Sequence, residues 1–310
     1  MKISAKIKCL IWLALTGFAM SCSKDKNDGF LSPALKYTNP SIKVAVGASL
    51  IQSGAMVTDE STKPLEFTIE GIYTADGKLA QSVMNYKVDT YFWQAEYTGK
   101  EKTVQELDSK RQKVNRPAID INPENGNILI YPEATDTLLL TKGKYTIDVK
   151  VKNSSGEKII KAALTVDISY ALPYTYRFSG IDGNLTGIDV TFDRQSNTGN
   201  KILVYVLKKD GTPVDPKLLF GYDYSSTPGV TDLKDWHNLG LNNPTKYTEF
   251  PDHLELEIAG FPLPFVAGQV LRIDMYNNGE INGSYFNYWF DMSILKEGIW
   301  KVTIKLKYNN

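Results

Sequence analysis

Apolar and polar residues alternate in short runs through residues 41–170, and this period-two pattern predicts β-strands. The expected strands cover residues 42–46, 65–72, 86–93, 119–121, 127–131, 138–140, 145–152 and 158–168. Thr, Val, Ile and Tyr are frequent in these runs, as is typical of strands half buried in a sheet. Trp93 is expected to lie in a core.

One stretch departs from the alternation and predicts a short helix. Residues 98–115 are polar apart from three apolar positions, Val104, Leu107 and Val114. Spacings of three and seven residues place these on one face of a helix. Thr103, followed three residues later by Glu106, is a capping-box signature. We expect this helix, or an ordered loop, to be inserted across the end of a sandwich.

The alternation stops at Ala171-Leu172-Pro173 and then resumes, which marks the best domain boundary. Further strands are expected at 175–178, 187–192, 202–208, 254–258, 269–275, 284–292 and 300–307. Trp300, in the last of these, is expected in a core. The pattern therefore predicts an all-β protein of two antiparallel β-sandwich domains, 41–171 and 172–310. The second is a sandwich or jelly-roll-like domain with a long loop.

That loop, residues 209–252, is rich in Gly, Pro, Asn and Asp and yet carries several aromatic rings. Loops this long are uncommon unless they are functional or disordered, and disordered segments are poor in aromatics. A sugar ring can pack its apolar C–H face on Trp or Tyr while its hydroxyls bond to Asn or Asp. The candidate ligand-binding residues are Trp236, Tyr222, Tyr224, Asp223 and Asn238. The alternative is that these rings form a small core within the loop.

The first 28 residues read as an export signal followed by polar residues. Three lysines precede an apolar run, Leu10–Ala19, which is about half the roughly 20 residues needed to span a bilayer. The segment ending at Cys22 resembles a bacterial lipoprotein signal with a relaxed lipobox, in which Ala19 replaces the usual Leu. The resemblance implies that 1–21 is removed and that Cys22 is lipidated. Ordinary secretion is the alternative.

Residues 22–40 lack periodicity and are expected to form a flexible tether. Asp25 and Asp28, just after Cys22, resemble the acidic export signal that sends some Bacteroidota-type lipoproteins to the outer face. A solvated linker is the alternative. The resemblance implies a lipid-anchored protein of the outer membrane at the cell surface, with the periplasmic face as the other option.

Charge and residue counts narrow the function classes. The precursor has no net charge, and loss of the three signal lysines leaves the mature chain near −3, which argues against nucleic acid as a partner. Only two cysteines occur, Cys9 in the signal and Cys22, so the folded part has no disulfide or thiol nucleophile. With two histidines and no HExxH, GxSxG or Walker-type motif, we expect no metal, no cofactor and no catalysis. A glycosidase using a carboxylate pair among Asp223, Asp232 and Asp235 stays open.

Two segments carry a resemblance to known surface domains. IDINPENGNILI (119–130) and KYTIDVKVKNSSGEK (144–158) resemble paired strands of cadherin-like and related immunoglobulin-like bacterial domains. This implies an immunoglobulin-like first domain with the short helical insertion. Cadherin calcium ligands are not recognisable, and residues 120–131 lack the spacing of a helix-loop-helix calcium site, so a turn held by its own Asn and Asp side chains is expected.

The signal, tether and two β domains together resemble uncharacterised Bacteroidota-type surface lipoproteins that accompany SusC/SusD-like glycan uptake systems. That resemblance implies a non-catalytic protein that captures a glycan for an outer-membrane uptake system. Its partners would be a polysaccharide, SusC/SusD-like outer-membrane proteins and, through the lipid on Cys22, the membrane. The alternatives are an adhesion or protein-interaction subunit of a surface complex and, third, a glycoside hydrolase.

Overall fold

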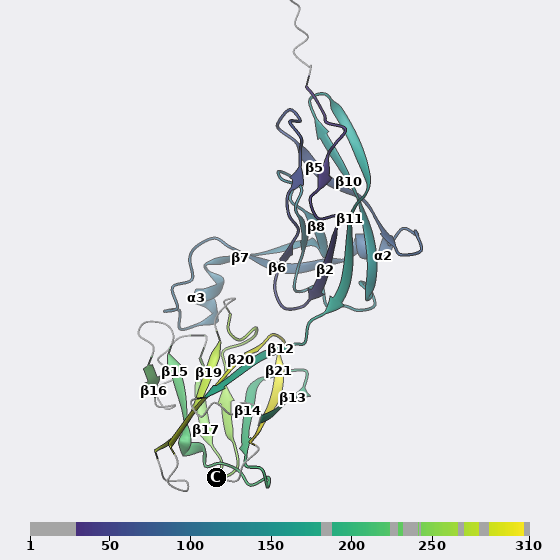
Figure 1. Ribbon diagram of the computed structural model, residues 1–310. Helices are drawn as coiled ribbons and strands as arrows, with labels where there is room; N and C mark the ends of the chain where they lie inside the picture. The colour runs from purple at the N-terminus through teal and green to yellow at the C-terminus, as the bar shows by residue number, and fades with distance from the viewer. Residues whose placement is uncertain are drawn as a thin grey trace, which may run out of the picture.

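Strands make up most of the described chain, and the predicted all-β class is confirmed (Figure 1). The computed structural model describes residues 29–180, 188–223, 229–231, 241, 243–265, 270–278 and 285–306. The first half contains β1 (Lys36–Tyr37), β2 (Ser41–Val46), β3 (Ile51–Gln52), β4 (Met56–Val57), β5 (Glu66–Thr74), α2 (Gln81–Asn85), β6 (Lys87–Trp93), α3 (Val104–Asp108), β7 (Arg111–Pro117), β8 (Ile119–Ile121), β9 (Ile128–Ile130), β10 (Gly143–Asn153) and β11 (Gly156–Tyr170). The second half contains β12 (Tyr174–Gly180), β13 (Ile188–Ser196), β14 (Asn200–Leu207), η2 (Pro216–Leu218), β15 (Leu219–Asp223), β16 (Gly229–Thr231), β17 (Lys246–Glu249), β18 (Leu254–Glu257), β19 (Leu271–Asn278), β20 (Tyr285–Ile294) and β21 (Gly298–Leu306).

The first half is a sandwich of two sheets, ordered β2-β11-β10-β5 and β3-β9-β8. Alternate residues of β10, which are Tyr145, Ile147, Val149 and Val151, are at most 3% exposed and form part of the core between the sheets. β11 pairs antiparallel with β10 but parallel with β2, and in the second half β14 pairs parallel with β21, so two pairs depart from the expected antiparallel pattern. The strong alternation of β10 explains why the sequence located this strand to within two residues of each end.

The second half is also a sandwich, with sheets ordered β12-β20-β19-β15-β16 and β13-β21-β14-β18-β17. Trp300, Val302, Ile304 and Leu306 of β21 are at most 3% exposed and lie in the core between these sheets, as the alternation predicted. The predicted long loop is not wholly irregular. It contributes η2, β15, β16 and β17.

A two-stranded ribbon, β6 paired with β7, leaves the first sandwich and reaches the second (Figure 1). We call residues 87–117 the arm. At its far end lies α3, where the hydroxyl of Thr103 accepts from the Glu106 backbone N–H at 3.1 Å and Glu106 accepts from the Lys102 N–H at 2.8 Å. The predicted helix and its cap are therefore confirmed for residues 103–108, but the placement of Val114 on the same helix face is wrong, because Val114 lies on β7 opposite Thr90. Leu107 is fully buried in a cluster with Leu241 and Phe265 of the second half.

The connection between the sandwiches is short. β11 ends at Tyr170 and β12 begins at Tyr174, so the predicted boundary falls between two strands and between two separate core clusters. Division into independently folding domains stays a prediction. Residues 138–140 form a turn rather than the predicted strand, because the Asp136 carboxylate accepts from the Leu138 N–H at 2.9 Å. Within the described ranges, no helix has the length and apolar character needed to cross a membrane.

Candidate functional site

The candidate binding residues of the long loop fall partly on β15 and partly outside the described residues. The backbones of Tyr222 and Asp223 belong to β15, which pairs with β16 and β19. Nothing is described of their side chains. Of the predicted lipidation and binding residues, four lie wholly outside the described ranges: Cys22, Tyr224, Trp236 and Asn238. Lipidation and the gathering of these rings around a ligand therefore stay predictions.

The sheet that contains β15 carries a buried carboxylate held by two arginines. Asp291 is 2% exposed, and its Oδ2 accepts from Nη2 of Arg177 at 2.7 Å and from Nη2 of Arg272 at 2.8 Å. Burial disfavours the charged form, but the bonds from both arginines outweigh it and lower the pKa of the Asp291 carboxyl. The guanidinium carbon of Arg272 lies 5.7 Å from the centre of the Trp289 ring. This sheet therefore carries two arginines, Arg177 and Arg272, that are held in place by Asp291, and one of them lies beside the Trp289 ring.

A second group of rings lies on the arm, where the sequence predicted a core. Tyr91 and Trp93 are 40% and 44% exposed, and because they are two residues apart on β6 they project from the same face. Phe92 projects from the opposite face, where its ring centre lies 6.3 Å from that of Tyr131. The prediction that Trp93 is a core residue is wrong. Among the described residues, β6 pairs with β7 alone, and this two-stranded ribbon leaves Tyr91 and Trp93 partly exposed.

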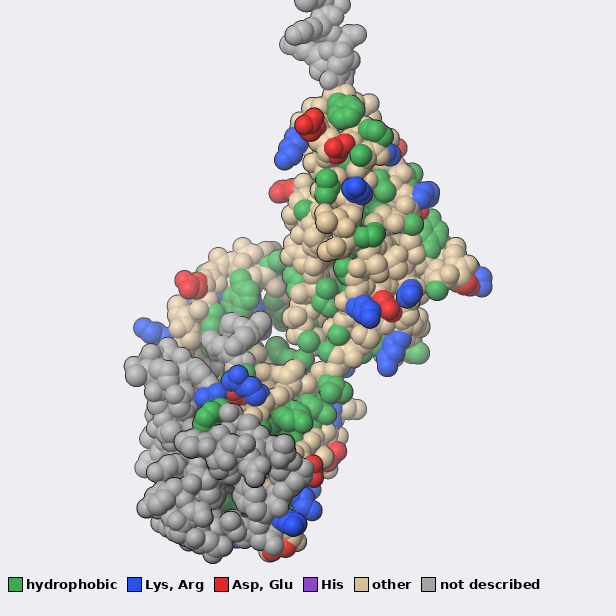
Figure 2. Space-filling view, viewed as in Figure 1, with side chains coloured by type: hydrophobic (Ala, Val, Ile, Leu, Met, Phe, Trp, Pro, Cys, Tyr) green, Lys and Arg blue, Asp and Glu red, His purple; other side chains and the backbone are tan. Residues whose placement is uncertain are grey.

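Polar and charged groups surround the rings of this face. The guanidinium carbon of Arg111 lies 3.9 Å from the centre of the Tyr91 ring, and Nε of Arg111 donates to Asp108 at 2.7 Å. Farther along the ribbon, Asp89 pairs with Lys113 at 2.9 Å and accepts from Asn115 at 2.8 Å. We call Tyr91, Trp93 and these neighbours the aromatic face of the arm. Hydrophobic side chains are visible along the arm beside the hollow between the two sandwiches (Figure 2).

The far end of the arm is fixed by buried polar contacts. Glu101 is 4% exposed, and its Oε1 accepts from Nζ of Lys110 and from the backbone and hydroxyl of Thr98. Burial opposes ionisation, but these hydrogen bonds outweigh it and lower the pKa of Glu101 to about 2. Burial, and secondly the charge of Glu101, raise the pKa of Tyr97 to about 12. The ring of Tyr97 lies 6.1 Å from that of Trp93, so the exposed ring stands next to an anchored one.

The arm also contacts the predicted binding loop directly. The backbone N–H of Leu241, inside segment 209–252, donates to the carbonyl of Glu101 at 3.3 Å. The two aromatic groups therefore belong to segments that meet. Three consecutive aromatics in β6 were the signal available in the sequence, because a strand must place at least one of them on each face. That signal does not reveal that the strand leaves the sandwich.

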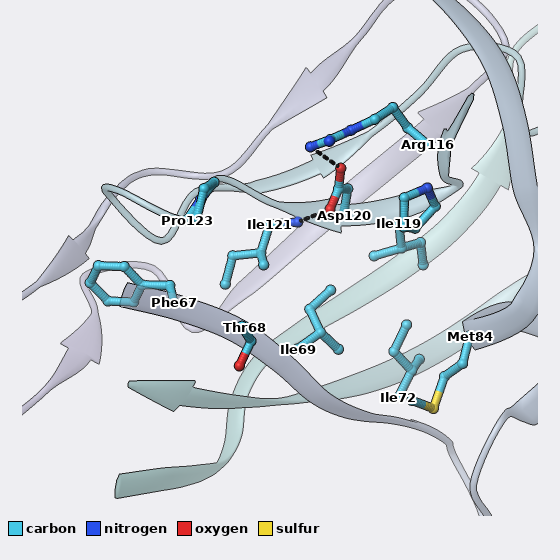
Figure 3. Close-up of a pocket in the computed structure, with 11 residues that line it drawn as sticks. Phe67, Thr68, Ile69, Ile72, Met84, Arg116, Ile119, Asp120, Ile121 and Pro123 are labelled. Atoms are coloured by element: carbon cyan, nitrogen blue, oxygen red, sulfur yellow. Dashed lines mark hydrogen bonds and ion pairs between the residues drawn. The ribbon is translucent and has the colours of Figure 1, made fainter. Parts of the chain in front are cut away.

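A pocket of about 390 Å³ opens on the first sandwich, well apart from the long loop in sequence (Figure 3). Its walls are mostly apolar and come chiefly from β5, β8, α2 and the end of β7. Arg116 and Asp120 provide its polar end, with Nη2 of Arg116 lying 2.7 Å from Oδ2 of Asp120. Sequence reasoning did not locate it, because β5 and β8 are about 50 residues apart and nothing in either strand predicts a gap between them.

The loop weighed as a calcium site is a turn held by its own side chains, as expected. Oδ1 of Asn122 accepts from the N–H of Glu124 at 2.9 Å, and Oδ1 of Asn125 accepts from the N–H of Asn127 at 2.9 Å. Among the described residues, no three His, Cys, Asp or Glu side chains come together as a metal site would require.

Comparisons with known proteins give limited information. A family model described as a domain of unknown function (DUF5007) matches residues 56–191, a stretch that contains the arm and both strands flanking the pocket. A search of curated proteins found no match. Three solved structures have 11% sequence identity to this chain. The first is the pair of tandem V-type regions of a v-region-containing chitin-binding protein, with a TM-score of 0.23 over 88% of this chain and 98% of that chain.

The second comprises the N-terminal four immunoglobulin domains of Dscam1, with a TM-score of 0.18 over 89% of this chain and 52% of that chain. The third is a SusE-like surface-located polysaccharide-binding protein from the Bacteroides thetaiotaomicron heparin utilisation locus, with a TM-score of 0.19 over 89% of this chain and 46% of that chain. At these values the likenesses carry no argument about function.

Proposed function

We propose that this protein is a non-catalytic glycan-binding protein of the cell envelope. The observation that carries the proposal is the aromatic face of the arm. There Tyr91 and Trp93 are 40% and 44% exposed, with charged and amide groups beside them. Rings this exposed gain little for folding, whereas a flat ring bordered by hydrogen-bonding groups suits the C–H face and hydroxyls of a sugar.

The fixed far end of the arm supports the same proposal. Leu107 is buried against the second sandwich and Glu101 is tied to Lys110, so the far end of the ribbon is held. The other end continues directly into the first sandwich, where the Ala118 N–H donates to the Tyr86 carbonyl at 2.8 Å. A ligand that stacks on Trp93 would therefore find the ring already positioned, and binding would cost less conformational entropy than ordering a loose loop.

The long loop extends the proposed binding surface. Leu241 brings this loop to the arm at Glu101, so the rings of Trp236, Tyr222 and Tyr224 could serve the same chain of sugars as the arm. Asp223 and Asn238 would supply hydrogen bonds to hydroxyls. A polysaccharide has many repeated rings, and several weak aromatic contacts along it add up through effective concentration.

Location follows from the signal sequence in this proposal. Lipid on Cys22 would hold the protein at the outer membrane, and SusC/SusD-like proteins would be the partners that receive the glycan. The first described residues support an outward orientation of the binding surface. Phe30 lies at the β10–β11 turn, where its carbonyl accepts from Asn153 at 2.9 Å. The second sandwich joins the other end of β11.

A glycan-array screen of the soluble chain 23–310, followed by calorimetry with the best glycan, tests the proposal. Trp93→Ala and Tyr91→Ala should each weaken binding by about 1–3 kcal/mol, as expected for a central aromatic contact. Phe92→Ala is the matched control, because Phe92 is 38% exposed on the opposite face of the same ribbon. Trp236→Ala reports separately on the long loop. If no glycan binds, or if Phe92→Ala weakens binding as much as Trp93→Ala, the proposal fails.

A further inference from the structure

The pocket of the first sandwich lies at a lateral gap between the edge strands of its two sheets. β5 is the last strand of one sheet and β8 the last strand of the other. The outer edge of β5 is closed at two points, where Phe67 N–H donates to the Pro123 carbonyl at 3.0 Å and Ala80 N–H donates to the Ile72 carbonyl at 2.7 Å. Between these points, among the described residues, β5 has no strand partner on this side.

A β-bulge lies in β5 between these two points, beside the gap. Ile69 is opposite Val149 and Gly71 is opposite Asp148, so Glu70 is an extra residue on β5. Bulges bend a strand and break its regular pairing, and they recur beside binding sites. Here the bend accompanies the opening between β5 and β8.

The walls of the gap are apolar. The side chains of Ile69 and Ile72 point from β5 toward Ile119 and Ile121 of β8, and Met84 of α2 closes one end (Figure 3). The volume of about 390 Å³ is more than twice the roughly 150 Å³ of a dry engineered cavity that binds benzene. The pocket therefore has room for a body of about two rings. It lacks the many polar partners that sugar hydroxyls need.

Arg116, at the polar end of the pocket, has one polar atom without an acceptor among the described residues. The carboxylate of Asp120 is bonded on both oxygens, by the Ile121 N–H at 2.8 Å and by Nη2 of Arg116 at 2.7 Å. The Nε–H of Arg116, in contrast, is buried and has no acceptor among the described residues. A buried donor without an acceptor is costly, so an oxygen atom placed there by a ligand would be stabilised.

The charge of the ligand follows from the same pair. Asp120 already neutralises Arg116, and an anionic ligand would bring a second negative charge beside that carboxylate. We propose that this pocket binds an uncharged, mostly apolar small molecule of about two rings that carries one hydrogen-bond-accepting oxygen. That oxygen accepts from Nε of Arg116, and the body packs on Ile69, Ile72 and Met84. The proposal for this site does not rest on glycan binding at the aromatic face.

The probe for the test is 6-propionyl-2-dimethylaminonaphthalene, an uncharged two-ring ketone whose emission shifts to the blue in apolar surroundings. It should bind the soluble chain saturably with one site per protein. The anion 8-anilinonaphthalene-1-sulfonate should bind at least about tenfold more weakly, a difference of about 1.4 kcal/mol. Equal or tighter binding of the anion would overturn the proposed selectivity, and absence of saturable ketone binding would overturn the site.

Two variants locate the probe. Ile69→Trp fills the pocket and should abolish the blue shift, whereas Ile159→Trp makes the same change at a residue 40% exposed on β11 and should leave it unaltered. Arg116→Lys keeps the ion pair but removes Nε, and should weaken ketone binding about three- to tenfold, as the loss of one hydrogen bond would.

A measurement on the unaltered protein covers the case in which Ile69→Trp does not fold. Saturating ketone should shift the methyl resonances of Ile69, Ile119 and Met84 and leave those of Ile159 in place. Shifts confined to residues outside the pocket would contradict the proposal.

Discussion

The guanidinium of Arg111 stacks on the ring of Tyr91, with its central carbon 3.9 Å from the ring centre. One face of this exposed tyrosine is thus covered by a cation, and the same arginine is bonded to Asp108, the last residue of α3. The contact joins the ribbon to the helix at its end. The Arg111 contact therefore holds the Tyr91 ring in place.

Arg111→Ala should lower the free energy of unfolding by about 0.5–1 kcal/mol, the scale of an exposed cation–π contact. Arg111→Lys should recover only part of this loss, since an ammonium cannot stack as a flat guanidinium does. Urea denaturation measures both changes. The control is Lys113→Ala, which removes an exposed ion pair with Asp89 and should cost less. A larger loss for Lys113→Ala than for Arg111→Ala would contradict the assignment.

Leu107→Ala should release the end of the arm without unfolding the sandwiches. Truncating a fully buried leucine costs about 2–5 kcal/mol, and a helix as short as α3 has little stability of its own. Hydrogen exchange of α3 and β7 amides should accelerate by tenfold or more, while β10 and β11 stay protected. Leu138→Ala, at a residue 86% exposed, should change neither. Uniform acceleration across both sandwiches would rule out a local release.

Glu101 should make stability depend on pH in the acid range. Its pKa in the folded protein, about 2, is below its ordinary value of 4.5, so the unfolded chain binds the proton more readily. The stabilising contribution is complete above about pH 4.5 and is lost as the pH falls toward 2. Urea denaturation of the wild-type protein and of Glu101→Gln, compared from pH 6 to pH 3, measures it. Superimposable pH profiles for the two proteins would refute this role.

Cys22→Ala should leave the protein uncleaved or free of the membrane fraction, because the lipid would have no attachment site. Incorporation of radiolabelled palmitate, measured with membrane fractionation, reports the outcome. Label that persists in the variant would show that the lipid is attached elsewhere or that no lipoprotein signal operates here.

The division at residues 171–173 predicts that chains ending near 170 and starting near 172 each fold cooperatively. The chain that ends near 170 would expose three residues of the arm that pack on the second half in the full protein, namely Leu107, Val104 and Tyr97. This chain is therefore expected to be the less stable of the two. Dispersed amide spectra from each chain would support the division. Undispersed spectra from both would mean that the halves need each other to fold.

The strands were predictable where one face is buried and the other is wet. β10 and β21 show this, since Val149 and Val302 are fully buried members of an alternating series. The run at 138–140 misled for a physical reason. Three leucines favour a strand, but only Leu140 is buried, and the Asp136 side chain bends the backbone into a turn.

The candidate site was less predictable, because it depends on where strands go after they form. β6 has the composition of a core strand, and nothing in residues 86–93 indicates that it would pair only with β7 and leave Trp93 in solvent. The pocket depends on β5 and β8 each having an edge without a strand partner among the described residues, which is a property of the assembled sheets. Of the candidate loop residues, Tyr222 and Asp223 lie on β15, and the binding role of all five stays a prediction.

The arm gives the two halves a second connection besides residues 171–173, and this restricts torsion. Rotation of one sandwich about the short linker would have to pull Leu107 out of its cluster with Phe265. β11 spans 15 residues, or about 50 Å, between the end near Phe30 and the end at the linker. If the chain is tethered before residue 30, the two sandwiches would move as one rigid body relative to the tether. A force applied to the second sandwich would then be transmitted to the tether, because no free hinge lies between the sandwiches to absorb it.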